Sequence, residues 1–259
     1  MDADVLDAIE AVDWSVVPGR RQPDLRELGV ECGPSRQLPY TVWYSPERVA
    51  DGLRDLAGAT SNLQAALAAS RLRGGGILHD HSGAVFPAAV VAAPILLDIA
   101  EHGHPKARAA CLSLLRESLE LYPLADYTRI DTISADGVPL CCAIAEHVRT
   151  RRDALSAQGP GAKSLLAEAA QHWRFQVDDV VIEHGDVAVF GVLHGAFPDG
   201  RQPAEVHDAH RDIGLTDVVL EIPPEYDSPE ACLRLIDVPA DRVRAGAVLY
   251  PAVCGERVH

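Results

Sequence analysis

Apolar residues recur every three or four positions over most of the first two-thirds of the chain, which is the period of an amphipathic helix. Residues 2–12 give a short acidic pattern of this kind, and residues 13–44 are irregular and rich in Pro, Gly and Arg. The period then resumes behind Ser45, a typical N-cap residue, with Pro46 at the first helical position. We therefore expect a second helix from residue 46 onward.

The helical period continues towards the middle of the chain. We expect further helices over residues 60–72, 84–101, 105–121, 138–155 and 161–175. The glycine run at 74–76 ends the first of these, and a Gly- and Pro-containing turn at 157–161 separates the last two. Aromatic residues make up only 5% of the chain, so the core consists mainly of small aliphatic side chains that suit closely packed helices.

After Trp173 the pattern changes to valine-rich runs that are typical of strands. We expect these strands within residues 175–183, 187–195, 216–222 and 231–239, with a hairpin turn at 184–186. The chain would then divide into an N-terminal helix with an irregular segment (1–45), a helical domain (46–172) and a C-terminal α+β domain (173–259).

Residues 94–115, PILLDIAEHGHPKARAACLSLL, resemble one unit of a HEAT-type repeat, as found in bacterial HEAT-like proteins. The positions that carry this resemblance are Pro94, Leu97, Asp98, Arg108, Ala109 and Leu112. The resemblance covers about half of the chain and implies stacked antiparallel helix pairs in an α–α superhelix. The fold expected from it is mainly α, with a small β-rich element at the C-terminal end.

Charge and composition narrow the classes of partner. The chain has 259 residues, of which 47% are hydrophobic, and a formal net charge of −15. Such an acidic surface repels phosphate backbones, so nucleic-acid binding is disfavoured and a basic protein or peptide is the better-matched partner. The acidic start lacks a secretory pattern, and the longest apolar run is too short to span a bilayer, which predicts a cytoplasmic protein with no membrane partner.

The cysteines give no metal motif. Six are present, at positions 32, 111, 141, 142, 232 and 254, and no CxxC occurs. Cys111, Cys141 and Cys142 lie in apolar helical runs, where a free thiol behaves as a small hydrophobic group. A nucleophile–base pair of Cys141 or Cys142 with His147 is disfavoured, because these positions face different directions on one helix. We therefore predict no metal site and no cofactor.

Histidines flank the apolar helix expected at 84–101, with His79 and His81 before it and His102 and His104 after it. A helix of that length separates the two pairs by roughly 27 Å, so all four cannot bind one metal. We interpret His79 and His81 as caps of a helix that starts near residues 82–83. A second group comprises His184, His194, His207 and His210, with Glu205 nearby and the last two on a short helix.

These observations support two hypotheses about function. The first is a non-enzymatic binding protein with a HEAT-like groove for a protein or peptide, an immunity or antitoxin role being one version. Its candidate binding residues are His79, Asp80, His81, Phe86, Trp173, His194 and Phe197. The alternative is an enzyme of unfamiliar type whose site, with or without a metal, lies where the helical and β-rich parts meet. Its candidate catalytic residues are His81, His194, His207 and His210.

Overall fold

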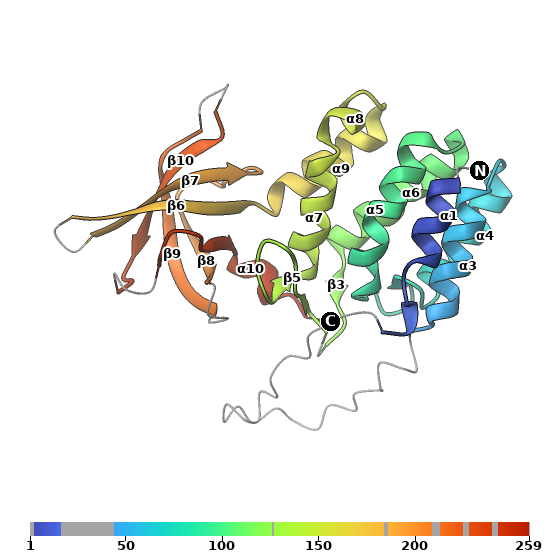
Figure 1. Cartoon of the computed structure of the whole chain (residues 1–259), viewed down its shortest axis with the longest axis horizontal. Helices are drawn as coiled ribbons and strands as arrows, with labels where there is room; N and C mark the ends of the chain where they lie inside the picture. The colour runs from blue at the N-terminus through green and yellow to red at the C-terminus, as the bar shows by residue number, and fades with distance from the viewer. Residues whose placement is uncertain are drawn as a thin grey trace.

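The computed structural model describes residues 3–16, 44–125, 127–183, 186–208, 213–224, 228–239 and 243–258. A helical part and a β-barrel lie side by side along the long axis of the molecule (Figure 1). The predicted irregular segment at 13–44 lies mostly outside the described residues, as do His184 and His210. Among the described helices, none is both long and apolar enough to cross a membrane.

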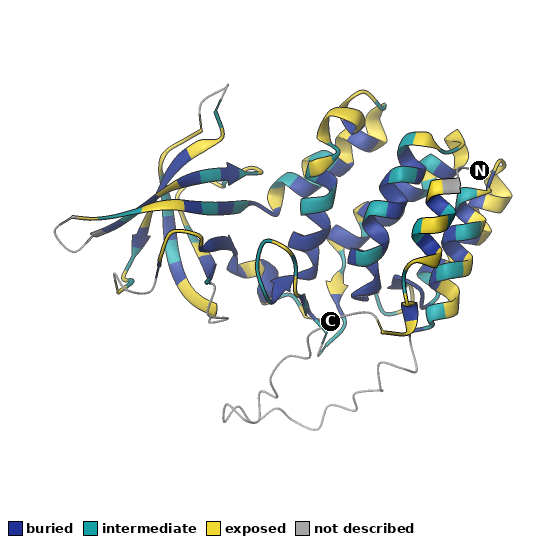
Figure 2. Cartoon of the chain, in the orientation of Figure 1, coloured by how far each residue is buried: buried dark blue, intermediate teal, exposed yellow. Residues whose placement is uncertain are grey.

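The helical part follows the predicted pattern, except that residues 138–155 form two helices after a short strand and the helix expected over 161–175 ends at Gln171. Its helices are α1 (Ala3–Glu10), α3 (Pro46–Ala57), α4 (Asn62–Arg73), α5 (Ala88–His102), α6 (Pro105–Glu120), α7 (Leu140–Thr150), α8 (Arg152–Ser156) and α9 (Pro160–Gln171), and a 3-10 turn, η1, spans Trp14–Val16. Ser45 caps α3 as expected, its hydroxyl accepting a hydrogen bond from the Arg48 N–H. The buried apolar faces of these helices form one continuous core (Figure 2).

The helix expected to begin near residues 82–83 begins later, so His79 and His81 do not cap it. Residues 78–85 instead form a hairpin of β1 (Leu78–His79) and β2 (Ala84–Val85). Strand β2 also pairs with β3 (Tyr122–Pro123), in the parallel direction. Gly83 turns the hairpin with a positive φ of 71°. Pro87 then precedes α5, where its fixed φ suits a helix start.

The prediction of a mainly α protein with a small β element is wrong, because the C-terminal part is a closed barrel. Its strands are β6 (Arg174–Glu183), β7 (Asp186–His194), β8 (Arg201–His207), β9 (Ile213–Ile222), β10 (Glu230–Ile236) and β11 (Val248–Pro251). Their order around the barrel is β10-β7-β6-β11-β8-β9, and all neighbouring pairs are antiparallel. The barrel has its own core, which contains Trp173 and Phe175.

Strands β8 and β11 explain both why the barrel closes and why the sequence did not predict a barrel. The sequence predicted β6, β7, β9 and β10 but neither of these two, which pair with each other and join β6 to β9. Strand β11 is also buried on both faces, since Leu249 packs in the barrel core while Val248 and Tyr250 pack in the helical core. The β8–β11 wall of the barrel is therefore the side that packs against the helices.

The remaining short elements lie at this junction. Strands β4 (Arg129–Ile130) and β5 (Val138–Pro139) pair in a small ribbon before α7, and α10 (Ala252–Gly255) follows β11. Figure 1 shows α10 and β5 beside α7, between the barrel and the helices. The C-terminal end of the chain thus returns from the barrel to the helical part, and the change from helix to strand falls at residues 172–173, between α9 and β6.

Candidate metal centre

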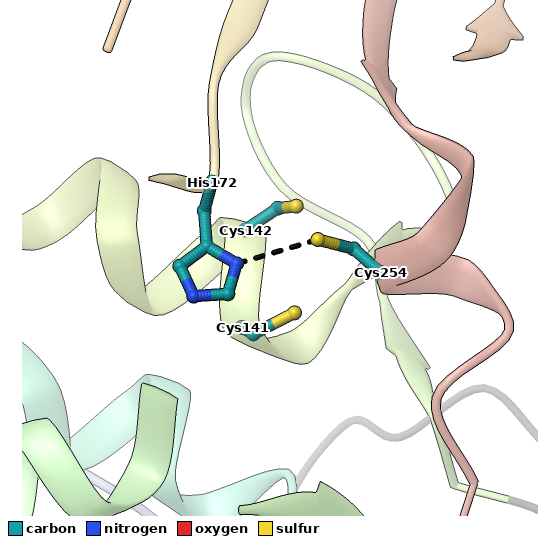
Figure 3. Close-up of side chains that lie close together, drawn as sticks. All are labelled: Cys141, Cys142, His172 and Cys254. Carbon is teal, nitrogen blue, oxygen red and sulfur yellow. Dashed lines mark hydrogen bonds between the residues drawn. The ribbon is translucent and has the colours of Figure 1, made fainter. Parts of the chain in front are cut away.

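Three cysteines and one histidine converge at the junction between the two parts. Cys141 and Cys142 lie in the first turn of α7, His172 directly follows α9, and Cys254 lies in α10. One ligand atom from each residue, a sulfur or a ring nitrogen, lies within 4.8 Å of all the others. Figure 3 shows the side chains pointing toward one another from these separate elements. Within the described part of the chain, no other group of three or more His, Cys, Asp or Glu residues meets this spacing.

The four side chains are removed from solvent, since none of the residues exposes more than 5% of its surface. Nδ1 of His172 lies 3.3 Å from Sγ of Cys254. Nε2 of the same ring is buried and has no hydrogen-bond partner among the described residues. Burying three thiols and an imidazole with so few polar partners is costly unless another group satisfies them.

The first turn of α7 favours thiolates at this point. The backbone N–H groups at a helix N-terminus are unpaired and carry a partial positive charge, which stabilises a nearby anion. Hydrogen bonds from Cys142 and Cys254 hold the pKa of the Cys141 thiol well below its usual value. Burial is the largest cause that raises the pKa of Cys142, and the hydrogen bond with the neighbouring Cys141 raises it further. The pKa values of these two neighbouring thiols therefore shift in opposite directions, that of Cys141 downward and that of Cys142 upward.

The end of α9 is held in place by neighbours that orient His172. The guanidinium of Arg149, on α7, donates to the carbonyl oxygens of Ala169 at 3.2 Å and His172 at 2.8 Å. The N–H of Ala196 donates to the Ala170 carbonyl at 2.7 Å. Carbonyl groups left unpaired at the end of a helix are satisfied in this way. Together, α7 and the end of β7 fix the direction in which His172 leaves the helix.

A buried polar network lies beside the cysteine cluster. Arg129 donates two hydrogen bonds to the Glu205 carboxylate, at 2.8 and 2.6 Å, which is a bidentate pair across the two parts. Nε2 of His207 lies 3.1 Å from the same carboxylate, and its Nδ1 lies 3.0 Å from the Asp136 carbonyl oxygen. Burial alone would raise the pKa of Glu205, but the hydrogen bonds from Arg129 and His207 outweigh it and lower this pKa.

Gly255 connects this network to the cluster, since it follows Cys254 directly in α10. A Cβ atom at this position would overlap the Glu205 carboxylate and the Arg129 guanidinium. Only glycine allows the backbone of α10 to approach the buried ion pair so closely. The position of Cys254 is therefore coupled to the packing of α10 against Glu205.

The candidate binding and catalytic residues lie at separate places. His79 and His81 contact each other at 5.9 Å between ring centroids, in the β1–β2 turn that also holds Asp80, and the His81 side chain is exposed. Phe86 is fully buried against Tyr44. Trp173 packs on Phe197 in the barrel, with ring centroids 4.9 Å apart. The first hypothesis grouped all of these residues as binding candidates, whereas only neighbours within each part are in contact.

The histidines of the second group also differ from expectation. His207 ends strand β8 rather than lying on a short helix with His210, because residues 201–207 pair with β9 and β11. His194 ends β7 and pairs across the strands with Arg174. Arg174 in turn contacts Ser134 and Glu146. Neither His194 nor His207 belongs to the metal-type cluster, whose histidine is His172.

Sequence reasoning missed the cluster because its ligands are far apart along the chain. The available signal was the pair Cys141–Cys142, which begins two residues after Pro139. This proline marks a helix start, so two sulfurs lie at the positive end of the helix. Comparison with protein-family models, curated proteins and solved structures gave no match for this chain. The chemistry of the site therefore rests on its own geometry.

Proposed function

We propose that this protein binds a zinc ion through Cys141, Cys142, His172 and Cys254, and that this centre fastens the barrel to the helical part. The observation that carries the proposal is the convergence of four buried sulfur and nitrogen ligand atoms within 4.8 Å. They come from three segments that meet at the junction. A Cys3His set is one of the usual structural zinc sites.

The dimensions and the ligand types both favour zinc. In a tetrahedral site with Zn–S bonds of about 2.3 Å, two sulfur ligands lie roughly 3.8 Å apart. The observed spacing needs only a small contraction around a single ion. Thiolate and imidazole ligands disfavour Mg²⁺ and Ca²⁺, which take oxygen ligands. The ligands of an iron–sulfur cluster spread around several atoms, so a set this compact favours one ion.

The arrangement supports a structural role over a catalytic one. A catalytic zinc keeps one coordination position open for water or substrate, whereas here four protein side chains would occupy all four positions of a tetrahedral ion. Their burial also denies access to a substrate. Since such a site does not exist in the unfolded chain, the free energy of zinc binding adds to the stability of the folded protein.

The buried histidine network also favours a structural reading of the junction over the enzyme hypothesis. Both ring nitrogens of His207 face hydrogen-bond partners, and its side chain is 1% exposed. A general base must reach a proton on its substrate, which this ring does not. We therefore propose a non-enzymatic protein in which zinc and the Arg129–Glu205 pair hold two parts in a fixed orientation.

Cobalt substitution tests this proposal. Tetrahedral Co²⁺ with thiolate ligands absorbs strongly in the visible range and shows a sulfur-to-cobalt charge-transfer band in the near ultraviolet. The reduced apoprotein should bind one equivalent of Co²⁺ with these bands, and Zn²⁺ should displace it. The His172→Ala variant should weaken binding and alter the visible bands, whereas His102→Ala, at the exposed end of α5, should not. Octahedral spectra, or spectra unchanged by His172→Ala, would refute a tetrahedral Cys3His centre.

A further inference from the structure

The outer face of the barrel carries a groove that the zinc proposal does not use. The register places Phe190 on β7, Cys232 on β10 and Ile222 on β9 in one row across three adjacent strands. Directly paired residues project to the same face of a sheet. Val189 and Leu233, the next residues in two of these strands, point into the barrel core. The row therefore faces outward.

The floor of this groove is apolar and its two walls are open to solvent. Phe190 is 39% exposed and Ile222 is 54% exposed, while Cys232 between them is only 2% exposed. Cys232 belongs to neither hydrophobic core, so its low exposure comes from the neighbours that rise on either side of it. The groove has a volume of about 500 Å³ and is also lined by Pro223 and Ala231. This volume is in the range of small-ligand and peptide-anchor pockets.

A β-bulge shapes one rim of the groove. The pairing of β6 with β7 shifts between Val177 and Asp179, which leaves Asp178 as the extra residue. Gly191 lies opposite this irregularity, and a Cβ atom there would overlap the carbonyl oxygen of Gln176. The glycine thus lets β6 approach β7 at the bulge, and Asp178 lines the groove as a result.

The rim is acidic and its charges are unbalanced. Asp178 and Glu230 line the groove, are exposed, and have no ion-pair partner among the described residues. The nearest cation on β10, Arg234, is already paired with Glu221 at 2.8 Å. The whole chain carries a net charge of −15, so the electrostatic potential around the groove is negative, as is its acidic rim. An exposed apolar floor with an uncompensated acidic rim is the complement of an apolar side chain flanked by cations.

We propose that this groove binds a basic peptide segment of a partner protein, with one apolar side chain seated over Cys232 between Phe190 and Ile222. Lysine or arginine residues next to that anchor would lie against Asp178 and Glu230. A second copy of this chain is disfavoured, because it would bring two acidic rims together. The proposal is independent of the zinc centre, which lies at the β8–β11 side of the barrel.

The test uses the full-length protein and a labelled synthetic peptide with a central leucine and lysines on both sides. Fluorescence anisotropy should show binding that weakens as salt rises. Replacing the leucine by serine, or the lysines by glutamates, should abolish it. Ile222→Ser should weaken binding at least about tenfold, because it removes a groove wall, and D178N/E230Q should do the same by removing the rim charge.

Two matched variants separate the groove from general attraction to an acidic protein. Leu215→Ser removes an exposed apolar side chain from the same strand, and D199N/D237N removes two exposed charges elsewhere on the barrel. Both should bind the peptide as the unmodified protein does. Equal binding by all variants, or no binding of the peptide, would overturn the proposal. A dimer that Ile222→Ser dissociates in sedimentation would place a second copy in the groove and overturn it as well.

Discussion

Nδ1 of His172 lies 3.3 Å from Sγ of Cys254, although 82 residues separate the two in the sequence. His172 lies two residues before the first strand of the barrel, and Cys254 lies three residues after its last strand. Their contact therefore brings together the two points at which the chain enters and leaves the barrel. Cys141 and Cys142 complete the group from α7, so a metal at this point would tie both ends of the barrel to one helix.

Because α10 lies so close to the buried ion pair, adding a single methyl group to its backbone at Gly255 should strongly affect the stability of the fold. Gly255→Ala should destabilise the fold by about 2–4 kcal/mol, because the added Cβ overlaps Glu205 and Arg129 and forces α10 to move. Gly214→Ala is the matched control, since nothing lies near its added Cβ. Urea denaturation of both variants measures the difference, and equal stabilities would show that α10 does not pack as described.

The Arg129–Glu205 pair predicts a large cost for removing one buried charge. Glu205→Gln keeps the size of the side chain but leaves the Arg129 guanidinium, 15% exposed, without its counter-charge. We expect a loss of about 3–5 kcal/mol in the free energy of unfolding. The exposed pair Arg201–Asp217 on the same barrel provides the comparison. Asp217→Asn should cost less than about 1 kcal/mol, and a similar cost for both variants would contradict the burial assigned to Glu205.

His194 predicts a specific pH response. Burial, together with the positive charges of Arg174 and Arg149, lowers the pKa of His194 below its usual 6.5, although Glu146 acts in the opposite direction. The folded state therefore binds a proton less readily than the unfolded state. The stability linked to this residue is complete above pH 6.5 and is lost as the pH falls from there toward the folded-state pKa.

Two measurements check this response. Titration of His194 followed by NMR should give a pKa below 6.5 in the folded protein. His194→Gln should lose less stability than the unmodified protein as the pH falls through this interval. A pKa at or above the usual value, or an unchanged pH profile in the variant, would show that the two arginines do not act on this ring.

Metal removal should expose the cluster to thiol reagents. With zinc bound, Cys141, Cys142 and Cys254 should resist alkylation, and a strong chelator should make them reactive while Cys111 in the helical core stays protected. If free zinc exceeds the dissociation constant a thousandfold, its removal costs about 4 kcal/mol. This corresponds to a fall of roughly 8–16 °C in Tm. Because burial alone also protects thiols, an unchanged Tm together with identical alkylation patterns with and without chelator, read by mass spectrometry, would show that no metal holds this cluster.

The helices and four of the six strands were predictable because their side chains follow the period of the element. Val49, Leu53 and Leu56 lie on the buried side of α3 as their spacing predicts. Strand β8 was missed because Glu205 and His207 occupy its outward buried positions, where an apolar residue would have marked a strand. Strand β11 has only four residues and ends in Pro251, so it offers no alternation to read. Without these two strands, closure of the barrel was not predictable.

The candidate metal site could not be predicted from sequence patterns for a related reason. Burial of Cys111, Cys141 and Cys142 was expected and is confirmed, yet all three were interpreted alike as small hydrophobic groups. What separates Cys111 from the others is the return of the chain to α7 through β11 and α10. That return places Cys254 beside Cys141, Cys142 and His172, and only the closed barrel brings it about.

Zinc content is the most direct test of the proposed centre. Elemental analysis of the purified, reduced protein should find about one zinc per chain, and Cys254→Ala should lose it. Cys111→Ala, which also removes a buried thiol, should keep it and serves as the control for folding. About one zinc in the unmodified protein and in Cys111→Ala, but none in Cys254→Ala, is the result that we predict. A metal-free protein that stays folded and does not take up added zinc, or zinc retained by Cys254→Ala, would contradict the account.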